Sequence, residues 1–201
     1  MEYFVEITPQ ERNILANLLG KPIDSIQDLS GAHTVGFCVR LNILGSTIDF
    51  TPDEIATPEA NKPYADVTRP LITNDQSALR PDLKWTTILE NAGTVDRIAI
   101  LHTLVTFSPL LSPSNPNVTT MIYGTGEAWG NIFLHPTKSA VDNLKVSDRY
   151  AVVYLDIGVT IFTNTGLAIT IMTDGTSYYV KSHIADKISD GLETYVALES
   201  I

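Results

Sequence analysis

The chain has 201 residues and a formal net charge of −10, from 13 Lys and Arg against 23 Asp and Glu. This balance excludes the basic face on which nucleic-acid binding depends, and it disfavours binding to an anionic membrane. Apolar residues make up 44% of the sequence, so we expect one globular domain over residues 1–201 that needs no disulfide or metal to be stable.

The N-terminal residues predict a short strand followed by a helix. Residues 3–7 favour the strand. Thr8, Pro9 and Glu11 then combine an N-cap, a proline in the first turn and the glutamate of a capping box. Gly20 and Pro22 end the predicted helix.

Residues 34–44 alternate between apolar and other side chains, which predicts a strand with one buried face. A turn at Gly45 and Ser46 leads into a returning strand over residues 47–50. Residues 51–81 contain five prolines, and we expect a long loop excursion with local turns. The acidic pair Asp53 and Glu54 makes this excursion a candidate binding surface.

The middle of the chain gives weaker signals. Asp82 and Gly93 predict the two ends of a helix over residues 83–92, and residues 95–107 favour a strand. Residues 118–123 and 131–135 favour strands on either side of the loop 124–130. A short helix is expected over residues 138–144.

The strongest signal lies between residues 150 and 181. Four apolar-rich segments, 150–157, 159–163, 167–173 and 177–181, predict consecutive strands. Turns are expected at residues 164–166 and at Asp174–Gly175, and a bend or bulge at Gly158. A helix over residues 184–190 and a strand over residues 192–198 complete the chain.

These elements predict an α+β fold. Its centre is a predominantly antiparallel β-sheet, a meander of about eight to ten strands, with three or four short helices packed on it. Strands follow one another directly instead of alternating with helices, which favours antiparallel pairing.

Few residues carry a chemical signal. The four histidines are widely spaced and there is one cysteine, Cys38, so we expect no metal site and no internal disulfide. The glycines of residues 124–130 do not match a dinucleotide-binding loop, and no cofactor is expected. An N-terminus without a basic, apolar leader predicts a cytoplasmic protein.

The function that best matches these signals is a non-catalytic binding or assembly protein. Its negative charge suits a basic protein partner, although self-association is also open. Glu127 and Trp129, which lie between glycines, are the candidate recognition residues together with the acidic pair.

Two other function classes stay open. One is a hydrolase-like enzyme with a cleft assembled from distant residues, in which His135 is the base and Glu127 the acid or orienting group. The other is a carrier that encloses a small ligand in an apolar pocket of the sheet. His102, which lies inside an apolar run, is expected to be a core residue.

Overall fold

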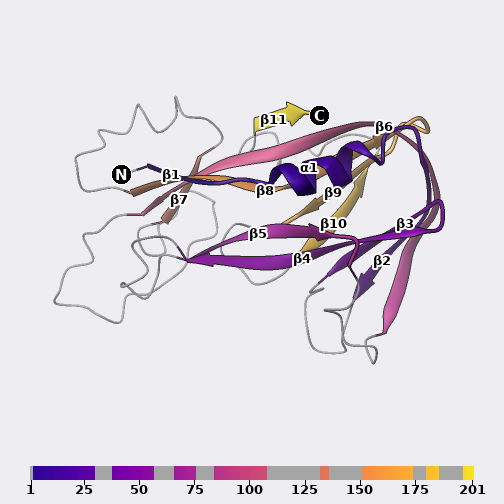
Figure 1. The fold of residues 1–201 in the computed structure, drawn as a ribbon, viewed down its shortest axis with the longest axis horizontal. Helices are drawn as coiled ribbons and strands as arrows, with labels where there is room; N and C mark the ends of the chain where they lie inside the picture. Colours follow the sequence, from indigo (N-terminus) through magenta and orange to yellow (C-terminus); the bar gives the residue numbers. More distant parts are fainter. Residues whose placement is uncertain are drawn as a thin grey trace.

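The computed structural model describes residues 2–29, 38–56, 66–75, 84–107, 132–135, 151–173, 180–185 and 197–201. These ranges contain one helix and eleven strands (Figure 1). The helix is α1 (Pro9–Ala16). The strands are β1 (Glu2–Val5), β2 (Pro22–Leu29), β3 (Val39–Ile43), β4 (Ser46–Ala56), β5 (Asp66–Thr73), β6 (Trp85–Phe107), β7 (Ile132–His135), β8 (Ala151–Thr163), β9 (Ala168–Met172), β10 (Lys181–Ala185) and β11 (Ala197–Ser200).

Strand β6 connects two layers. Neighbouring strands follow the order β10-β9-β8-β6-β2-β3-β4-β5, with β7 and β11 also beside β6 and β1 beside β8. Residues 85–94 of β6 pair with β2, and residues 95–107 pair with β8. Every pairing is antiparallel except β1 with β8, which is parallel. The β2–β5 layer and the β8–β9 layer therefore share one long strand.

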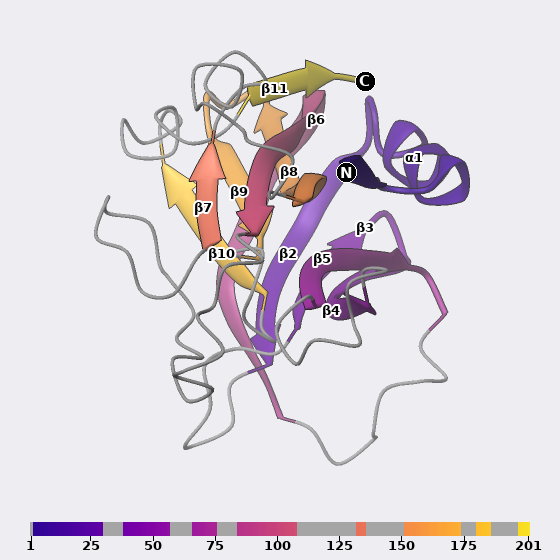
Figure 2. The same ribbon diagram turned by 90° about the vertical axis from the view of Figure 1, so that its left-hand side faces the viewer.

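The main hydrophobic core lies between these two layers. Phe50 and Leu41 contribute from the β2–β5 layer, and Ile100, Val159 and Ile171 contribute from the β8–β9 layer, all fully buried. Helix α1 adds Leu15 to the same core. Figure 2 shows α1 at one side of the molecule, above the ends of β3, β4 and β5. The helix thus covers one end of the space between the layers.

The β3–β4 hairpin confirms the alternation expected there. Val39, Leu41 and Ile43 are buried, whereas the residues between them are half-buried. The connecting turn consists of Leu44 and Gly45, which have φ angles of 44° and 74°. Both values suit the two-residue turn that follows the twist of a hairpin, but leucine is an unusual residue for a positive φ.

Gly158 lies at a bulge in β8, as the sequence predicts. Leu101 of β6 pairs with Gly158, and the next residue, His102, pairs with Asp156. A Cβ atom at Gly158 would lie 2.3 Å from the carbonyl oxygen of Ile171. Only glycine allows β8 and β9 to approach this closely.

The expected α+β class with three or four packed helices is wrong. The described residues contain one helix, α1, and residues 85–92 of the helix predicted over residues 83–92 belong to β6. Thr86, Thr87 and Ile88 are consecutive β-branched residues, and pairing with β2 determines their conformation. Gly93, predicted to end that helix, has φ +97° within the strand.

The Pro-rich segment 51–81 is also more regular than expected. It contains the second half of β4 and all of β5, where Pro52 pairs with Pro70. Among the described residues, β3 pairs with β4 as far as Phe50, and β5 is the last strand in the order. Within those ranges Pro52 and Pro70 therefore each have one neighbouring strand, a position in which strands tolerate proline.

Other expectations have mixed outcomes. The N-terminal helix, its capping box and the turn after β8 are confirmed. Ile184 and Ala185, expected in a helix, belong to β10. The loop 124–130, the turn at 174–175 and the helix at 138–144 lie outside the described residues. No helix in the described ranges has the length and apolar character needed to cross a membrane.

Candidate functional site

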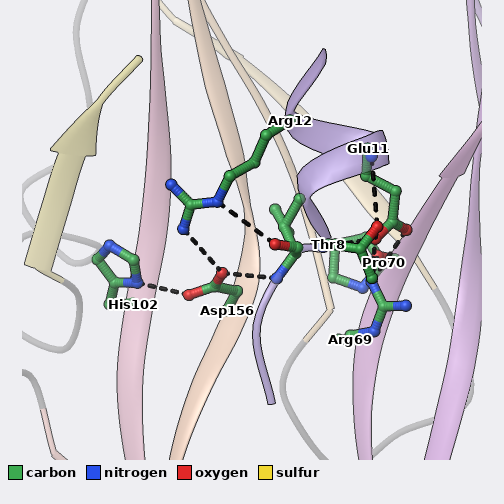
Figure 3. A network of polar contacts seen from close by, with 8 residues as sticks. Thr8, Glu11, Arg12, Arg69, Pro70, His102 and Asp156 are labelled. Atoms are coloured by element: carbon green, nitrogen blue, oxygen red, sulfur yellow. Dashed lines mark hydrogen bonds and ion pairs between the residues drawn. The ribbon is translucent and has the colours of Figure 1, made fainter. Parts of the chain in front are cut away.

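The N-terminal segment is attached to the sheets through two polar clusters, one on each side of α1 (Figure 3). The first begins with the capping box. The Glu11 backbone N–H donates to the Thr8 hydroxyl oxygen, and the Glu11 carboxylate accepts from the Thr8 backbone N–H at 2.8 Å. This reciprocal pair fixes the start of α1 and orients the Glu11 side chain.

Glu11 is the centre of the first cluster. Its carboxylate accepts hydrogen bonds from Arg69 at 2.8 Å and from the backbone N–H of Ile72 at 3.0 Å, both on β5. Arg69 also lies 3.0 Å from Asp53 of β4. The side chains of Glu11 and Arg69 are only 5% and 8% exposed, so α1 is joined to the β2–β5 layer by a buried ion pair.

These contacts change the acidity of Glu11. Burial by itself raises the pKa of the carboxyl group. The hydrogen bonds from Thr8 and Ile72 and the charge of Arg69 outweigh that effect, so the pKa of Glu11 lies below its ordinary value. The group is therefore ionised at neutral pH, as a buried partner of arginine must be.

Asp156 of β8 is the centre of the second cluster. Its Oδ1 atom lies 2.5 Å from Nδ1 of His102 on β6. Its Oδ2 atom accepts a hydrogen bond from the backbone N–H of Ile7 at 2.7 Å and lies 3.7 Å from the guanidinium of Arg12. The Asp156 side chain is 3% exposed, whereas those of His102 and Arg12 are about one-third exposed. Asp156 thus joins α1 and the end of the N-terminal segment to the β8–β9 layer.

A stacked aromatic pair, in which Phe4 is exposed and Tyr154 half-buried, lies on the same face of the sheet as the second cluster. Phe4 of β1 and Tyr154 of β8 are paired in register, and their rings stack at 4.5 Å with an interplanar angle of 7°. Tyr154 and Asp156 are two residues apart on β8 and share a face. Phe4 is 62% exposed, the second highest value among the exposed large apolar residues. We call Phe4, Glu6 and Tyr154 the β1 face.

The burial of the N-terminal segment alternates residue by residue. Phe4 and Glu6 are exposed, while Val5 and Ile7 are buried. The segment is therefore attached by one set of side chains and presents the other set to solvent. Exposed aromatic residues that are held rigidly supply contact area for a partner at low entropic cost.

Of the site residues that the sequence predicts and the structure describes, Asp53 alone lies in one of these two clusters. Asp53 contacts Arg69 in the first cluster, and Glu54 is exposed on β4. His135 is the last residue of β7 and pairs with Leu104 of β6. Glu127 and Trp129 lie outside the described residues.

Apart from the Thr8–Glu11 capping box and Asp53, sequence reasoning missed the residues that form the two clusters. Asp156 had a visible signal, because it is a single carboxylate inside the apolar run 151–161. His102, expected in the core, is instead half-buried beside that carboxylate. Phe4 had no comparable signal, since strand alternation does not say which face of a short strand is covered.

Both clusters hold elements of the fold together. Within the described ranges, every buried side-chain nitrogen and oxygen has a hydrogen-bond partner, and no group of three or more His, Cys, Asp or Glu residues is arranged to hold a metal. Asp156 divides its two oxygens between His102 and the N-terminal segment. Both carboxylates therefore act as junctions between elements.

No protein family, curated protein or solved structure matches this chain.

Proposed function

We propose that this protein is a non-catalytic binding protein that recognises a basic protein partner through the β1 face. The observation that carries the proposal is the stacked pair of Phe4 and Tyr154, with Phe4 62% exposed on a short strand held by buried contacts. An exposed aromatic ring on a rigid element is a common anchor of protein interfaces.

Charge supports a basic partner. The formal net charge of −10 favours encounter with a positively charged surface. Glu6 is exposed two residues from Phe4, and Arg12 nearby forms an ion pair with Asp156. The single cysteine suits a reducing compartment such as the cytoplasm, where the proposed partner would be encountered.

A second candidate function is acid–base catalysis at His102. The short contact between His102 and a buried carboxylate orients the imidazole, as in many enzymes that use histidine as a base. We prefer the binding function because Asp156 also accepts from Ile7 and contacts Arg12, which is the pattern of a structural junction. Loss of a measured turnover in His102→Ala, with folding intact, would reverse this preference.

The proposal is tested by site-directed crosslinking in the native host. A photoreactive phenylalanine derivative at position 4 should crosslink to a protein with an excess of Lys and Arg. The same derivative at Leu44, which is 66% exposed on the β3–β4 turn, is the matched control. Glu6→Lys should strongly reduce the crosslink at position 4.

Three results would overturn the proposal. The first is a crosslinking yield at position 4 no higher than at position 44. The second is a crosslink only to an acidic protein. The third is a crosslink only to a second copy of the chain, which would instead establish self-association.

A further inference from the structure

The backbone pairing of β1 with β8 stops one residue short of Asp156. Its last pair in register is Val5 with Leu155, and Asp156 is the next residue on β8. A side-chain contact follows the last strand pair, because Oδ2 of Asp156 accepts a hydrogen bond from the backbone N–H of Ile7 at 2.7 Å. Asp156 thus continues the attachment of the N-terminal segment beyond the end of β1.

The backbone of Ile7 is held through both of its polar groups (Figure 3). Its N–H donates to Asp156, and its carbonyl oxygen accepts a hydrogen bond from Nε of Arg12 at 3.3 Å. The guanidinium of Arg12 in turn lies 3.7 Å from the Asp156 carboxylate. Ile7 and Asp156 are both buried, so water cannot readily replace the carboxylate as the acceptor.

The two carboxylates of the clusters hold consecutive backbone groups of this segment. Asp156 accepts from the N–H of Ile7, and Glu11 accepts from the N–H of Thr8. The other contacts of Glu11 lead to β5. Asp156 instead lies on β8 with Tyr154, two residues away on the same face. Of the two carboxylates, Asp156 is therefore the one that shares a strand with the aromatic stack.

Loss of the hydrogen bond to Ile7 would affect the attached state of the segment alone. In that state the Ile7 N–H is buried and would lack an acceptor, whereas water accepts from it in a detached segment. Strand β1 has four residues and pairs with β8 in parallel, the less stable arrangement. Elements with few contacts open locally at a low free energy. Removing the acceptor therefore shifts the local equilibrium towards detachment.

From this we infer that Asp156 is the positioning residue of the β1 face, which holds Phe4 against Tyr154 where the partner binds. The inference rests on the proposed function and adds a residue that acts through the segment, since the Asp156 side chain is 3% exposed. A partner meets a complete β1 face only while the segment is attached. Its apparent affinity should therefore fall with the attached fraction.

The test compares Asp156→Ala with the wild type in two measurements. Hydrogen exchange of the backbone N–H groups of residues 3–6, followed by NMR, reports detachment and should become about tenfold faster or more. Crosslinking from the photoreactive phenylalanine derivative at position 4 reports recognition, and its yield should fall by at least about half. If the alanine variant does not fold, Asp156→Val takes its place, because valine suits a strand.

Two control variants separate positioning from a general loss of stability. Asp156→Asn keeps a carbonyl oxygen for the Ile7 N–H, so its exchange rates should stay within about threefold of the wild type. Leu41→Ala removes a fully buried side chain from β3 and lowers the stability of the whole protein. At a temperature at which the variant is folded, it should leave the crosslinking yield at position 4 unchanged.

The two measurements separate this inference from the proposed function. Unchanged exchange in the Asp156→Ala or Asp156→Val variant would overturn the inference, and so would an asparagine variant that behaves like the alanine variant. Faster exchange with an unchanged crosslinking yield would show that recognition does not depend on Asp156, while the proposed function would stand. A wild-type yield at position 4 no higher than at position 44 would remove the proposed function and this inference together.

Discussion

Replacing Glu11 with alanine should weaken the attachment of α1 to the β2–β5 layer and destabilise the protein. The variant loses the hydrogen bonds from Thr8, Ile72 and Arg69. Removing one partner of a buried ion pair destabilises a protein by about 3–5 kcal/mol, and losing the hydrogen bond from the Thr8 backbone N–H adds about 1 kcal/mol. Arg69 keeps its contact with Asp53, so we expect the lower part of this range, a total of about 4 kcal/mol.

The assay is thermal and denaturant unfolding followed by circular dichroism. In a protein of this size a change of 1 kcal/mol lowers the Tm by about 2–4 °C, so Glu11→Ala should lower it by about 8–16 °C. Glu6→Ala removes an exposed glutamate from the same segment and should change stability by less than about 0.5 kcal/mol. A loss below about 1 kcal/mol in Glu11→Ala would refute the view of Glu11 as a buried junction.

The lowered pKa of Glu11 predicts that the stability of the protein depends on pH. Because the pKa of Glu11 is lowered from its ordinary value of 4.5, its contribution to stability is complete above that value. The contribution is lost as the pH falls through the lower, folded-state pKa. The difference in stability between the wild type and Glu11→Gln should therefore shrink below about pH 4, and a constant difference down to pH 2 would contradict the assignment.

Three further variants or measurements test other parts of the fold. Leu44→Asn should stabilise the protein by about 1 kcal/mol in thermal unfolding, because asparagine tolerates the φ of 44° better than leucine; a lower Tm would contradict this. Gly158→Ala should destabilise by about 3 kcal/mol, since its Cβ would meet the Ile171 carbonyl at 2.3 Å; native-like stability would show that β8 and β9 can separate freely. Burial, reinforced by the nearby Asp49 charge, raises the pKa of the Cys38 thiol to about 12. An aromatic disulfide reagent at pH 8 should therefore label this thiol only after unfolding. Rapid labelling of the native protein would count against the burial of Cys38.

Local signals predicted some elements well. Thr8 and Glu11 identified the start of α1 because a capping box is made by residues three apart in sequence. The alternation of Val39, Leu41 and Ile43 identified β3 because one face of that strand is buried and the other is half-buried. In both cases the information lies within a few neighbouring residues.

Strand β2 escaped prediction because its pattern is irregular. Ile23, Ile26 and Leu29 are buried at intervals of three residues, which resembles neither a regular strand nor a full helical face. Register shifts between Ile23 and Ser25 and between Ile26 and Gln27 produce this spacing. A bulge changes the side-chain period and conceals a strand from any analysis of alternation.

The polar clusters escaped prediction for a different reason. Ile7 and Asp156 are 149 positions apart in sequence, and Glu11 and Arg69 are 58 apart. Glu11 and Arg69 alone are each compatible with a solvated surface, and the apolar run around Asp156 does not identify its partners. Only the complete fold brings the partners together. The contact of Asp53 with Arg69 could not be predicted for the same reason, because it depends on the β4–β5 register.

The parallel pairing of β1 with β8 has a consequence for the order of events during synthesis. Residues 2–7 leave the ribosome well before the strand that receives them, which begins at Ala151. Until that strand emerges, Phe4 has no Tyr154 to stack on and Ile7 has no carboxylate to meet. Recognition of a partner through Phe4 and its neighbours would thus report that β8, which is synthesised much later, has already folded.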